Sequence, residues 1–308
     1  MRIAIGLPTR QDPGQRDHVL AWAAAADVGP FSSLAVGDRV VAPAHEALAV
    51  LAACSAVTRR IGLMASLVVG PIRETTLLAR QSATIDVLSG GRLTLGVGVG
   101  AREDDYQATG TPFRDRGAQS ERQLAALRRL WHGEPLERAE AGPATGATVA
   151  GSATGASVGR IGIAPARAGG PEVLVGGYVP AIAGRIARFG DGFMAPGGAD
   201  PVAIAGLWKQ IETAWSEADR AGRPRMIAGS YFALGPDAVA AAAAYIDAYY
   251  GYDPKVAARR LADLPTSAEA ILAVIRRTED LGADELILRP VRADHMMRER
   301  LADLISGG

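Results

Sequence analysis

Eight short apolar segments alternate with longer segments of helical periodicity along this 308-residue chain. The apolar segments have the length of buried strands, and the longer segments place apolar residues three and four positions apart. The predicted strands span residues 2–7, 33–37, 61–69, 93–99, 171–175, 192–195, 226–234 and 285–289. The predicted helices span residues 18–27, 46–58, 74–88, 121–131, 181–189, 201–221, 237–250, 255–264, 266–281 and 293–305.

Strict alternation of eight strands with helices predicts an α/β fold, a (β/α)8 TIM barrel, in one domain over residues 1–308. A doubly wound open sheet has the same alternation and is the competing fold. In a barrel the active site lies at the C-terminal ends of the strands. The residues that directly follow each strand are therefore the first candidates for function.

The middle of the chain changes character. Residues 139–159 are almost entirely Ala, Gly, Thr and Ser, with a single charge at Glu140. A segment without periodicity and without an apolar face cannot pack as a regular element. We predict a mobile, low-complexity insertion over residues 139–170, between the fourth and fifth strands, which could serve as a lid.

Charge and composition exclude several classes of protein. Thirty-three basic and thirty-three acidic residues cancel, which argues against a nucleic acid or an anionic membrane as partner. Cys54 is the single cysteine, and the four histidines do not stand at metal-ligand spacings, so we expect no metal site. The start, MRIAIGLPTR, is unlike a secretory signal, and no run of eighteen residues is apolar and uncharged. We therefore expect a cytoplasmic protein.

Charged residues follow the second and fourth predicted strands. Asp38 and Arg39 could form a simple surface ion pair, but a barrel would turn them toward its mouth. Arg102 and Asp105 belong to a polar run after the fourth strand, of which we expect one member to face the mouth. His45 precedes a helix, where it could act in the site or only cap the helix.

Glycines mark two further strand ends. Gly96, Gly98 and Ala101 fit the dinucleotide pattern GxGxxA, but the glycines lie inside the strand, and the polar residues after it argue against a helix start there. Glycines in a strand indicate close approach of another group, which favours a flat ligand over the strand end. Gly177, between Gly176 and Tyr178, precedes a helix, and such a turn can bind phosphate through backbone N–H groups. A GxSxG match at residues 155–159 lies in the insertion, where chance matches are frequent.

Residues 84–100, TIDVLSGGRLTLGVGVG, closely resemble the signature of the bacterial luciferase-like flavin-dependent oxidoreductases. Further similar segments stand in the same order along the chain: VGDR at 36–39, VTRRIGL at 57–63, DY at 105–106, VGG at 175–177, GDGF at 190–193 and GADEL at 282–286. The resemblance covers nearly the whole chain apart from the insertion. It implies a TIM barrel with a flavin or a deazaflavin coenzyme over the C-terminal mouth.

The resemblance also implies roles for individual residues. A non-proline cis peptide at Ser66–Leu67 would back the flavin ring, and the phosphate would rest on Gly176, Gly177 and Tyr178. The residues that would flank the ring are Asp38, Val97, Gly98 and Gly100. Many members carry an acid–base histidine where this chain has Arg39, and deazaflavin-dependent dehydrogenases often carry a glutamate where it has Ala101.

Both departures argue against hydride transfer from an alcohol. We therefore expect a monooxygenase that uses reduced FMN and dioxygen on a small organic substrate, with a separate flavin reductase as partner and no assigned general base. Arg39 or Arg102 would stabilise negative charge during oxygen activation or bind an anionic substrate, with His45 and Asp105 as further catalytic candidates. We also expect a homodimer. Two alternatives stay open: a deazaflavin-dependent reductase or dehydrogenase, and a flavin-binding protein without catalysis.

Overall fold

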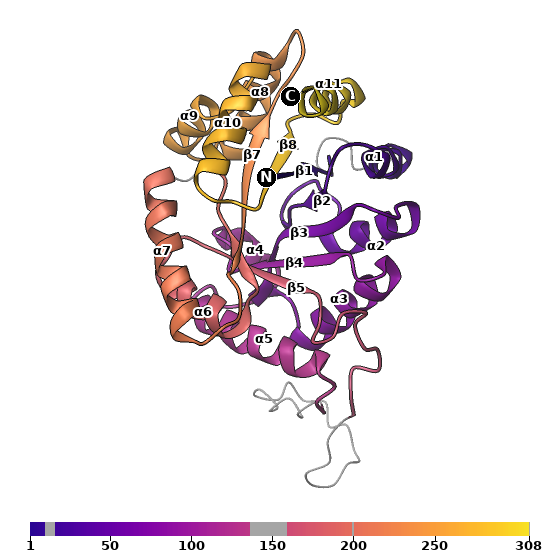
Figure 1. Ribbon diagram of the computed structural model, residues 1–308, viewed down its shortest axis with the longest axis vertical. Helices are drawn as coiled ribbons and strands as arrows, with labels where there is room; N and C mark the ends of the chain where they lie inside the picture. Colours follow the sequence, from indigo (N-terminus) through magenta and orange to yellow (C-terminus); the bar gives the residue numbers. More distant parts are fainter. Residues whose placement is uncertain (10–15, 136–158, 199, 308) are drawn as a thin grey trace.

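The computed structural model describes residues 1–9, 16–135, 159–198 and 200–307. Eight parallel strands form a closed barrel in the order β1 to β8, with helices packed around it (Figure 1). The strands are β1 Arg2–Gly6, β2 Ser33–Val36, β3 Gly62–Val69, β4 Leu93–Gly98, β5 Glu172–Gly176, β6 Gly192–Met194, β7 Arg225–Phe232 and β8 Glu285–Pro290. The predicted TIM barrel is confirmed, and the open sheet is excluded because β1 pairs with β8.

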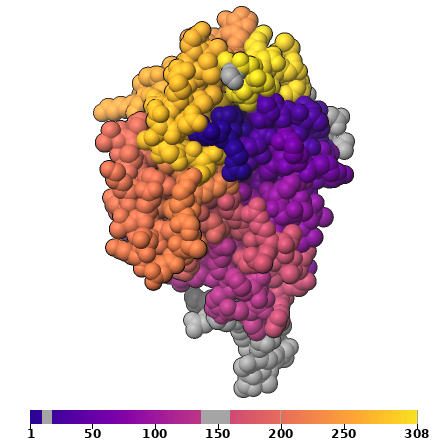
Figure 2. Space-filling model, in the orientation of Figure 1, coloured from indigo at the N-terminus to yellow at the C-terminus, as the bar shows by residue number. Residues whose placement is uncertain are grey.

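The helices connect successive strands. Those between β1 and β5 are α1 Arg16–Val28, α2 Ala47–Val57, the short 3₁₀ helix η1 Gly70–Ile72, α3 Thr75–Ser89, α4 Glu103–Ala108 and α5 Arg116–Trp131. Those after β5 are α6 Ala181–Phe189, α7 Pro201–Glu217, α8 Ala238–Tyr250, α9 Pro254–Ala262, α10 Ala268–Asp280 and α11 His295–Ser306. Closure of the barrel brings the first and last parts of the chain side by side (Figure 2).

Alternation along the strands divides the apolar residues into two cores. Side chains that point into the barrel form a small inner cluster, and those that point outward pack beneath the helices in a much larger one. The inner cluster consists of Ala4, Ala35, Met64, Leu174, Met194, Ile227 and Ile287, with Leu67 packed against it. The inner cluster fills the barrel, so a ligand can only lie above it.

Charged side chains close the N-terminal end of the barrel. Arg225 forms ion pairs with Glu172 and with Glu285, whose side chain is fully buried. Thr94 Oγ1 donates to Glu172 Oε2 at 2.7 Å, and Ser32 Oγ donates to Glu285 Oε1 at 2.5 Å. Buried carboxylates need such partners because an unpaired buried charge is costly.

Helix α4 was not predicted from the sequence. The polar residues after β4 argued against a helix start, yet Glu103, Asp104 and Asp105 form the first turn of α4. That expectation was wrong because carboxylates are favourable in a first turn, where the helix dipole is positive. The helix also buries Tyr106, whose hydroxyl donates to the Val99 carbonyl at 2.5 Å.

The predicted insertion lies only partly within the described residues, since residues 136–158 fall outside them. Residues 159–170 are packed: Ile161 is 6% exposed and joins the outer core, and the Arg167 N–H donates to Asp86 Oδ2 at 3.0 Å. The prediction of a mobile insertion over residues 139–170 is therefore wrong for residues 159–170. The described residues 159–170 lead into β5 at the N-terminal end of the barrel, opposite the mouth, so this part gives no support to a lid.

Candidate active site

A cavity of about 640 Å³ lies at the C-terminal ends of the strands. Pockets of a few hundred to a thousand Å³ hold small molecules and cofactors. Most of the predicted site residues line it: Asp38, Arg39, Ser66, Leu67, Gly98, Gly100, Arg102, Asp105, Gly176, Gly177 and Tyr178. Val97 and His45 are not among its lining residues.

Leu67 forms the floor of the cavity. It packs on the inner barrel cluster and borders Gly98 and Gly176, where an added Cβ would collide with its side chain. The Ser66–Leu67 peptide is cis, as predicted, and lies where the register of β3 against β4 shifts between Ala65 and Val68. The bulge near the end of β3 thus presents the apolar side chain of Leu67 to the mouth.

The alternating glycines of β4 serve the protein's own packing. A Cβ at Gly96 would collide with the Ala65 carbonyl and would lie 2.8 Å from Met194 Cε. A Cβ at Gly98 would lie 2.7 Å from Leu67 Cδ1. The sequence correctly indicated a close approach, but the approaching groups are the bulge and Leu67, and a ligand would meet Leu67 above them.

Val97 faces away from the mouth. Its side chain is fully buried in the outer core, beside Gly70, where a Cβ would lie 2.8 Å from Val97 Cγ1. Because Gly96 and Gly98 point inward, the residue between them must point outward. The alternation of the strand was therefore the signal that should have removed Val97 from the predicted site.

His45 lies at the start of α2, and its N–H donates to the Thr9 carbonyl at 3.2 Å. Its Nε2 atom is buried without a hydrogen-bond partner among the described residues. Thr9 lines the cavity, but His45 meets it through its backbone N–H and is not itself a lining residue, so we do not retain His45 as a catalytic candidate.

Asp38 is fixed at the end of β2. Its Oδ2 accepts from the Val69 N–H at 3.0 Å, and Arg73 Nη2 lies 2.9 Å from its Oδ1. Arg73 also pairs, at 2.7 Å, with Glu46, the N-cap residue of α2. Burial raises the pKa of Glu46, but hydrogen bonds from Ala49 and the charge of Arg73 outweigh burial and lower it overall. The Asp38 carboxylate is thus a neutralised, rigid part of the rim.

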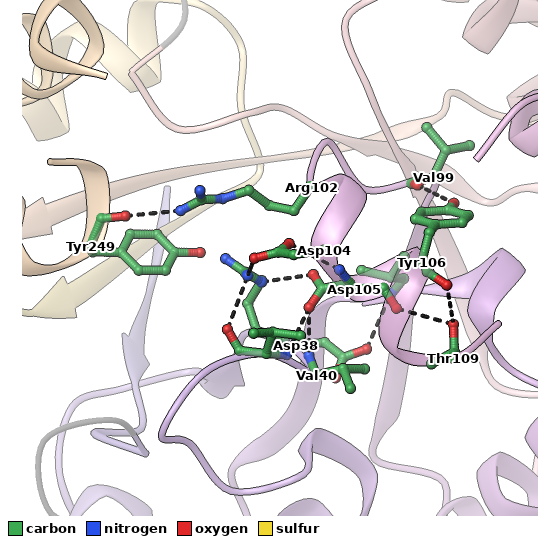
Figure 3. A network of polar contacts seen from close by, with 12 residues as sticks. Asp38, Val40, Val99, Arg102, Asp104, Asp105, Tyr106, Thr109 and Tyr249 are labelled. Atoms are coloured by element: carbon green, nitrogen blue, oxygen red, sulfur yellow. Dashed lines mark hydrogen bonds and ion pairs between the residues drawn. The ribbon is translucent and has the colours of Figure 1, made fainter. Parts of the chain in front are cut away.

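Arg39 is held by two carboxylates of α4. Its Nε lies 2.7 Å from Asp105 Oδ2 and its Nη2 lies 2.9 Å from Asp104 Oδ2. Asp105 Oδ1 also accepts the N–H groups of Val40 at 3.0 Å and Val41 at 2.8 Å, so it holds the loop after β2 (Figure 3). Burial lowers the pKa of Arg39, but these carboxylates and Tyr249 outweigh burial and raise it, so Arg39 stays charged.

Arg102 reaches across the mouth. Its Nη2 donates to the Tyr249 carbonyl at 3.0 Å (Figure 3). Its guanidinium carbon lies 3.6 Å from the Tyr252 ring centroid. The left-handed Gly100, with φ of 66°, turns the chain between β4 and α4, and a Cβ there would lie 2.9 Å from Val69 Cγ1. Arg102 therefore links the loop after β4 to the end of α8.

Tyrosines form the wall of the cavity beside α8. Tyr245, Tyr249 and Tyr250 stand at helical spacing, which is typical of packing, and the rings of all three contact aromatic neighbours. They also line the cavity, together with Tyr231, whose hydroxyl lies 3.3 Å from that of Tyr250. Burial and the neighbouring tyrosine hydroxyls raise the pKa of Tyr250 well above its ordinary value, so it remains a neutral phenol. Helical spacing alone could not distinguish packing from lining.

Three arginines that the sequence did not single out line the cavity: Arg260, Arg277 and Arg289. Arg289, in β8, donates from Nη2 to the Ser66 carbonyl at 3.2 Å and to Ser66 Oγ at 3.0 Å. Arg260, in α9, donates to the Gly197 carbonyl. Arg289 lies at a strand end, and that position was the signal by which it could have been found.

The turn after β5 has the position expected for a phosphate site. Gly176, Gly177 and Tyr178 border the cavity and lead into α6, whose N-cap is Pro180. A Cβ at Gly177 would lie 3.3 Å from Ile182 Cδ1. Backbone N–H groups at a helix N-terminus favour an anion.

Within the described parts of the chain, no group of three or more His, Cys, Asp or Glu residues could hold a metal ion. None of the described helices is long and apolar enough to cross a membrane.

Comparison with known sequences finds one family model and several relatives. The model of the luciferase-like monooxygenases matches residues 1–302. The uncharacterized protein Rv0940c of Mycobacterium tuberculosis is 29% identical over 178 residues, which are 58% of this chain and 57% of that protein. The FMNH(2)-dependent dimethylsulfone monooxygenase of Pseudomonas putida is 32% identical over 90 residues, 28% of this chain and 24% of that enzyme. The matched segment thus spans about half of the first relative and about a quarter of the second.

Solved structures share the fold. The monooxygenase RslO1 from Streptomyces bottropensis superposes with a TM-score of 0.75 at 20% identity, covering 100% of this chain and 98% of that one. An F420-dependent secondary alcohol dehydrogenase superposes with a TM-score of 0.72 at 19% identity, covering 96% and 95%. A monooxygenase and an F420-dependent dehydrogenase thus share the fold of this chain. With the family match over residues 1–302, the chain belongs to the luciferase-like monooxygenase family.

Proposed function

We propose that this protein is a flavin-dependent monooxygenase that uses reduced FMN and dioxygen to oxygenate a small organic substrate. The observation that carries the proposal is the cavity at the barrel mouth, with the side chain of Leu67 as an apolar floor and the turn 176–178 at one edge. A planar ring system fits above such a floor, and an attached phosphate fits the helix N-terminus beside it.

The residues present fit a flavin phosphate ester. Leu67 would support the ring from below, and Gly176, Gly177 and Tyr178 would hold the phosphate. Asp38, Gly98 and Gly100 would border the ring at the ends of β2 and β4. When bound, the reduced flavin supplies the electrons that activate dioxygen, and a separate flavin reductase would deliver it.

The protein's own side chains would shape and dry the reaction space. Asp105 holds Arg39 and the loop after β2, and Arg102 joins the mouth to α8. The tyrosine wall contributes aromatic surface, which limits the entry of water. We assign Arg39 and Asp105 to positioning this rim and Arg102 to closing it.

A binding and reoxidation experiment tests the proposal. We would titrate the purified protein without oxygen with photoreduced FMN and, separately, with a reduced deazaflavin coenzyme. We would then admit dioxygen and measure hydrogen peroxide released per flavin oxidised. Tight binding of reduced FMN and slow, oxygen-dependent reoxidation support the proposal.

Three other results would redirect it. Binding of the reduced deazaflavin alone selects the reductase or dehydrogenase alternative. Flavin binding with no change in oxygen reactivity selects a binding protein without catalysis. Binding of neither coenzyme overturns the proposal.

A further inference from the structure

Positive charge is in excess around one part of the cavity. The carboxylate of Asp38 is paired with Arg73, and that of Asp105 with Arg39. These pairs leave the described rim carboxylates beside β2 and β4 already neutralised. Asp263 also borders the cavity, but it is exposed to solvent at the end of α9.

Arg289 has no carboxylate within 4 Å among the described residues, although it is partly buried in the floor of the mouth. Its two hydrogen bonds both come from Nη2 and both go to Ser66. A guanidinium carries five N–H donors in a fixed fork, so Nη1 and Nε keep capacity for a further acceptor. Partial burial reduces the hydration of this cation, and an anion bound at Nη1 and Nε would supply a counter-charge.

Two glycines make room for this side chain. A Cβ at Gly6 in β1 would lie 3.0 Å from Arg289 Cγ, and a Cβ at Gly229 in β7 would collide with Arg289 Nη1. The strands on both sides of β8 thus leave open the space in which Arg289 lies across the end of the barrel. The position of the guanidinium is therefore fixed by three strands.

A second arginine approaches the same place. Arg260 donates to the carbonyl of Gly197, and a Cβ at Gly197 would lie 2.8 Å from the Gly229 carbonyl oxygen. Arg260 also has no carboxylate within 4 Å among the described residues, and its guanidinium carbon lies 5.4 Å from the Tyr250 ring centroid. Arg260 and Arg289 thus flank the contact between Gly197 and Gly229.

This excess charge lies away from the turn that would hold a phosphate. Arg289 is on β8, whereas Gly177 follows β5, and three strand steps separate these two strands around the closed barrel. The tyrosine wall, which includes Tyr231 on β7, is next to Arg289 instead. A charged group bound here would belong to a molecule beside the ring and not to the phosphate.

We propose that the substrate of this site carries an oxyanion, a carboxylate or a sulfonate, and that Arg289 binds it on the tyrosine-lined side of the mouth. This inference rests on the proposed function only for the chemistry that follows binding. A fork-shaped guanidinium matches such an oxyanion with two parallel hydrogen bonds. Arg289 is then the residue that selects charged over neutral substrates.

Two pairs of small molecules that differ in charge but little in shape test this selection. Benzoate is compared with benzamide, and methanesulfonate with dimethyl sulfone, by calorimetric titration of the protein with and without FMN. We expect each anion to bind at least about tenfold more tightly than its neutral partner, and the preference to weaken as salt is added. Equal binding within both pairs would overturn the proposal without any variant.

Variants then assign the preference to Arg289. In Arg289→Met the preference should disappear, whereas Arg289→Lys should keep part of it because the charge remains but the fork is lost. Arg292→Met is the matched control, since Arg292 is outside the cavity lining and pairs with Asp237. Circular dichroism and melting curves establish that each variant is folded.

Other outcomes separate the two possible sources of negative charge. If Arg289→Met weakens the binding of reduced FMN about tenfold and leaves the anion preference intact, Arg289 binds the flavin and the proposal is overturned. If the preference persists in Arg289→Met with FMN affinity unchanged, another residue carries it. If the wild-type protein binds no FMN but prefers the anions, the proposed function fails and the anion site stands.

Discussion

The Nε atom of Arg39 lies 2.7 Å from Oδ2 of Asp105, and this ion pair joins the loop after β2 to the first turn of α4. Asp105 is 1% exposed, and its second carboxylate oxygen holds the backbone N–H groups of Val40 and Val41. One buried carboxylate therefore fixes both an arginine and the loop that carries it. The rim of the mouth depends on this pair.

Arg39→Met should lower the rate of dioxygen consumption with reduced FMN and substrate by about 10- to 100-fold, with flavin affinity little changed. The reason is that a buried charge-assisted hydrogen bond is worth about 1.5–3 kcal/mol. Asp105→Asn should act in the same direction. Glu103→Gln is the control, because Glu103 is exposed in the same first turn of α4 and does not line the cavity. Unchanged turnover in both Arg39→Met and Arg102→Met would remove these arginines from the mechanism.

Gly177→Asp should abolish binding of FMN while leaving the fold intact. The new carboxylate would face the phosphate, and like charges held close together repel. Gly177→Asn has nearly the same shape without the charge and should retain most of the affinity. Fluorescence titration with FMN measures both. Equal affinity of Gly177→Asp and the parent would show that the phosphate binds elsewhere.

Glu285→Ala should destabilise the protein by about 3–5 kcal/mol, because it leaves Arg225 without its fully buried partner at the N-terminal end of the barrel. Urea unfolding followed by circular dichroism gives the free energy of unfolding. Glu299→Ala is the control, since Glu299 is 53% exposed beside Arg298 and such surface pairs contribute less than about 1 kcal/mol. A loss in Glu285→Ala no larger than in this control would contradict the role of the cluster.

Cys54 should react with a thiol reagent only when the protein unfolds. Burial in α2 raises the pKa of its thiol from 9.0 to about 12, and the thiolate is the reactive form. Because the folded state holds this proton more tightly than the unfolded state, the associated stability is complete below pH 9 and decreases between pH 9 and about 12. Labelling at pH 8 with and without urea tests the first statement. Rapid labelling of the folded protein would contradict it.

The alternation of strands and helices was determined by the sequence alone. Periodicity is a local property, because a strand or helix segment needs its apolar residues at fixed spacing wherever it packs. The same alternation, with the rule that barrel sites lie at strand ends, led to Asp38, Arg39, Arg102 and Asp105, all of which line the cavity. The family signature at 84–100 added the cis peptide at Ser66–Leu67.

Only the tertiary structure decided which charges are already neutralised. Arg39 and Arg289 both follow or end a strand, and nothing near them in the sequence distinguishes their roles. Arg39 pairs with Asp105, which stands 66 positions further along the chain. Arg289 instead donates to Ser66, 223 positions away, and contacts no carboxylate among the described residues. Ion pairs between distant segments depend on how the barrel closes, and the periodicity of the sequence does not determine which segments closure brings together.

The same physical reason explains the tyrosine wall. Tyr245 and Tyr249 have the spacing of a packed helix face, and α8 does pack through that region. That this face also borders the mouth follows from the position of α8 after β7, beside Arg102 from the loop after β4. The chain thus encodes its elements locally, while the chemistry of the mouth arises from residues that only the closed barrel brings together.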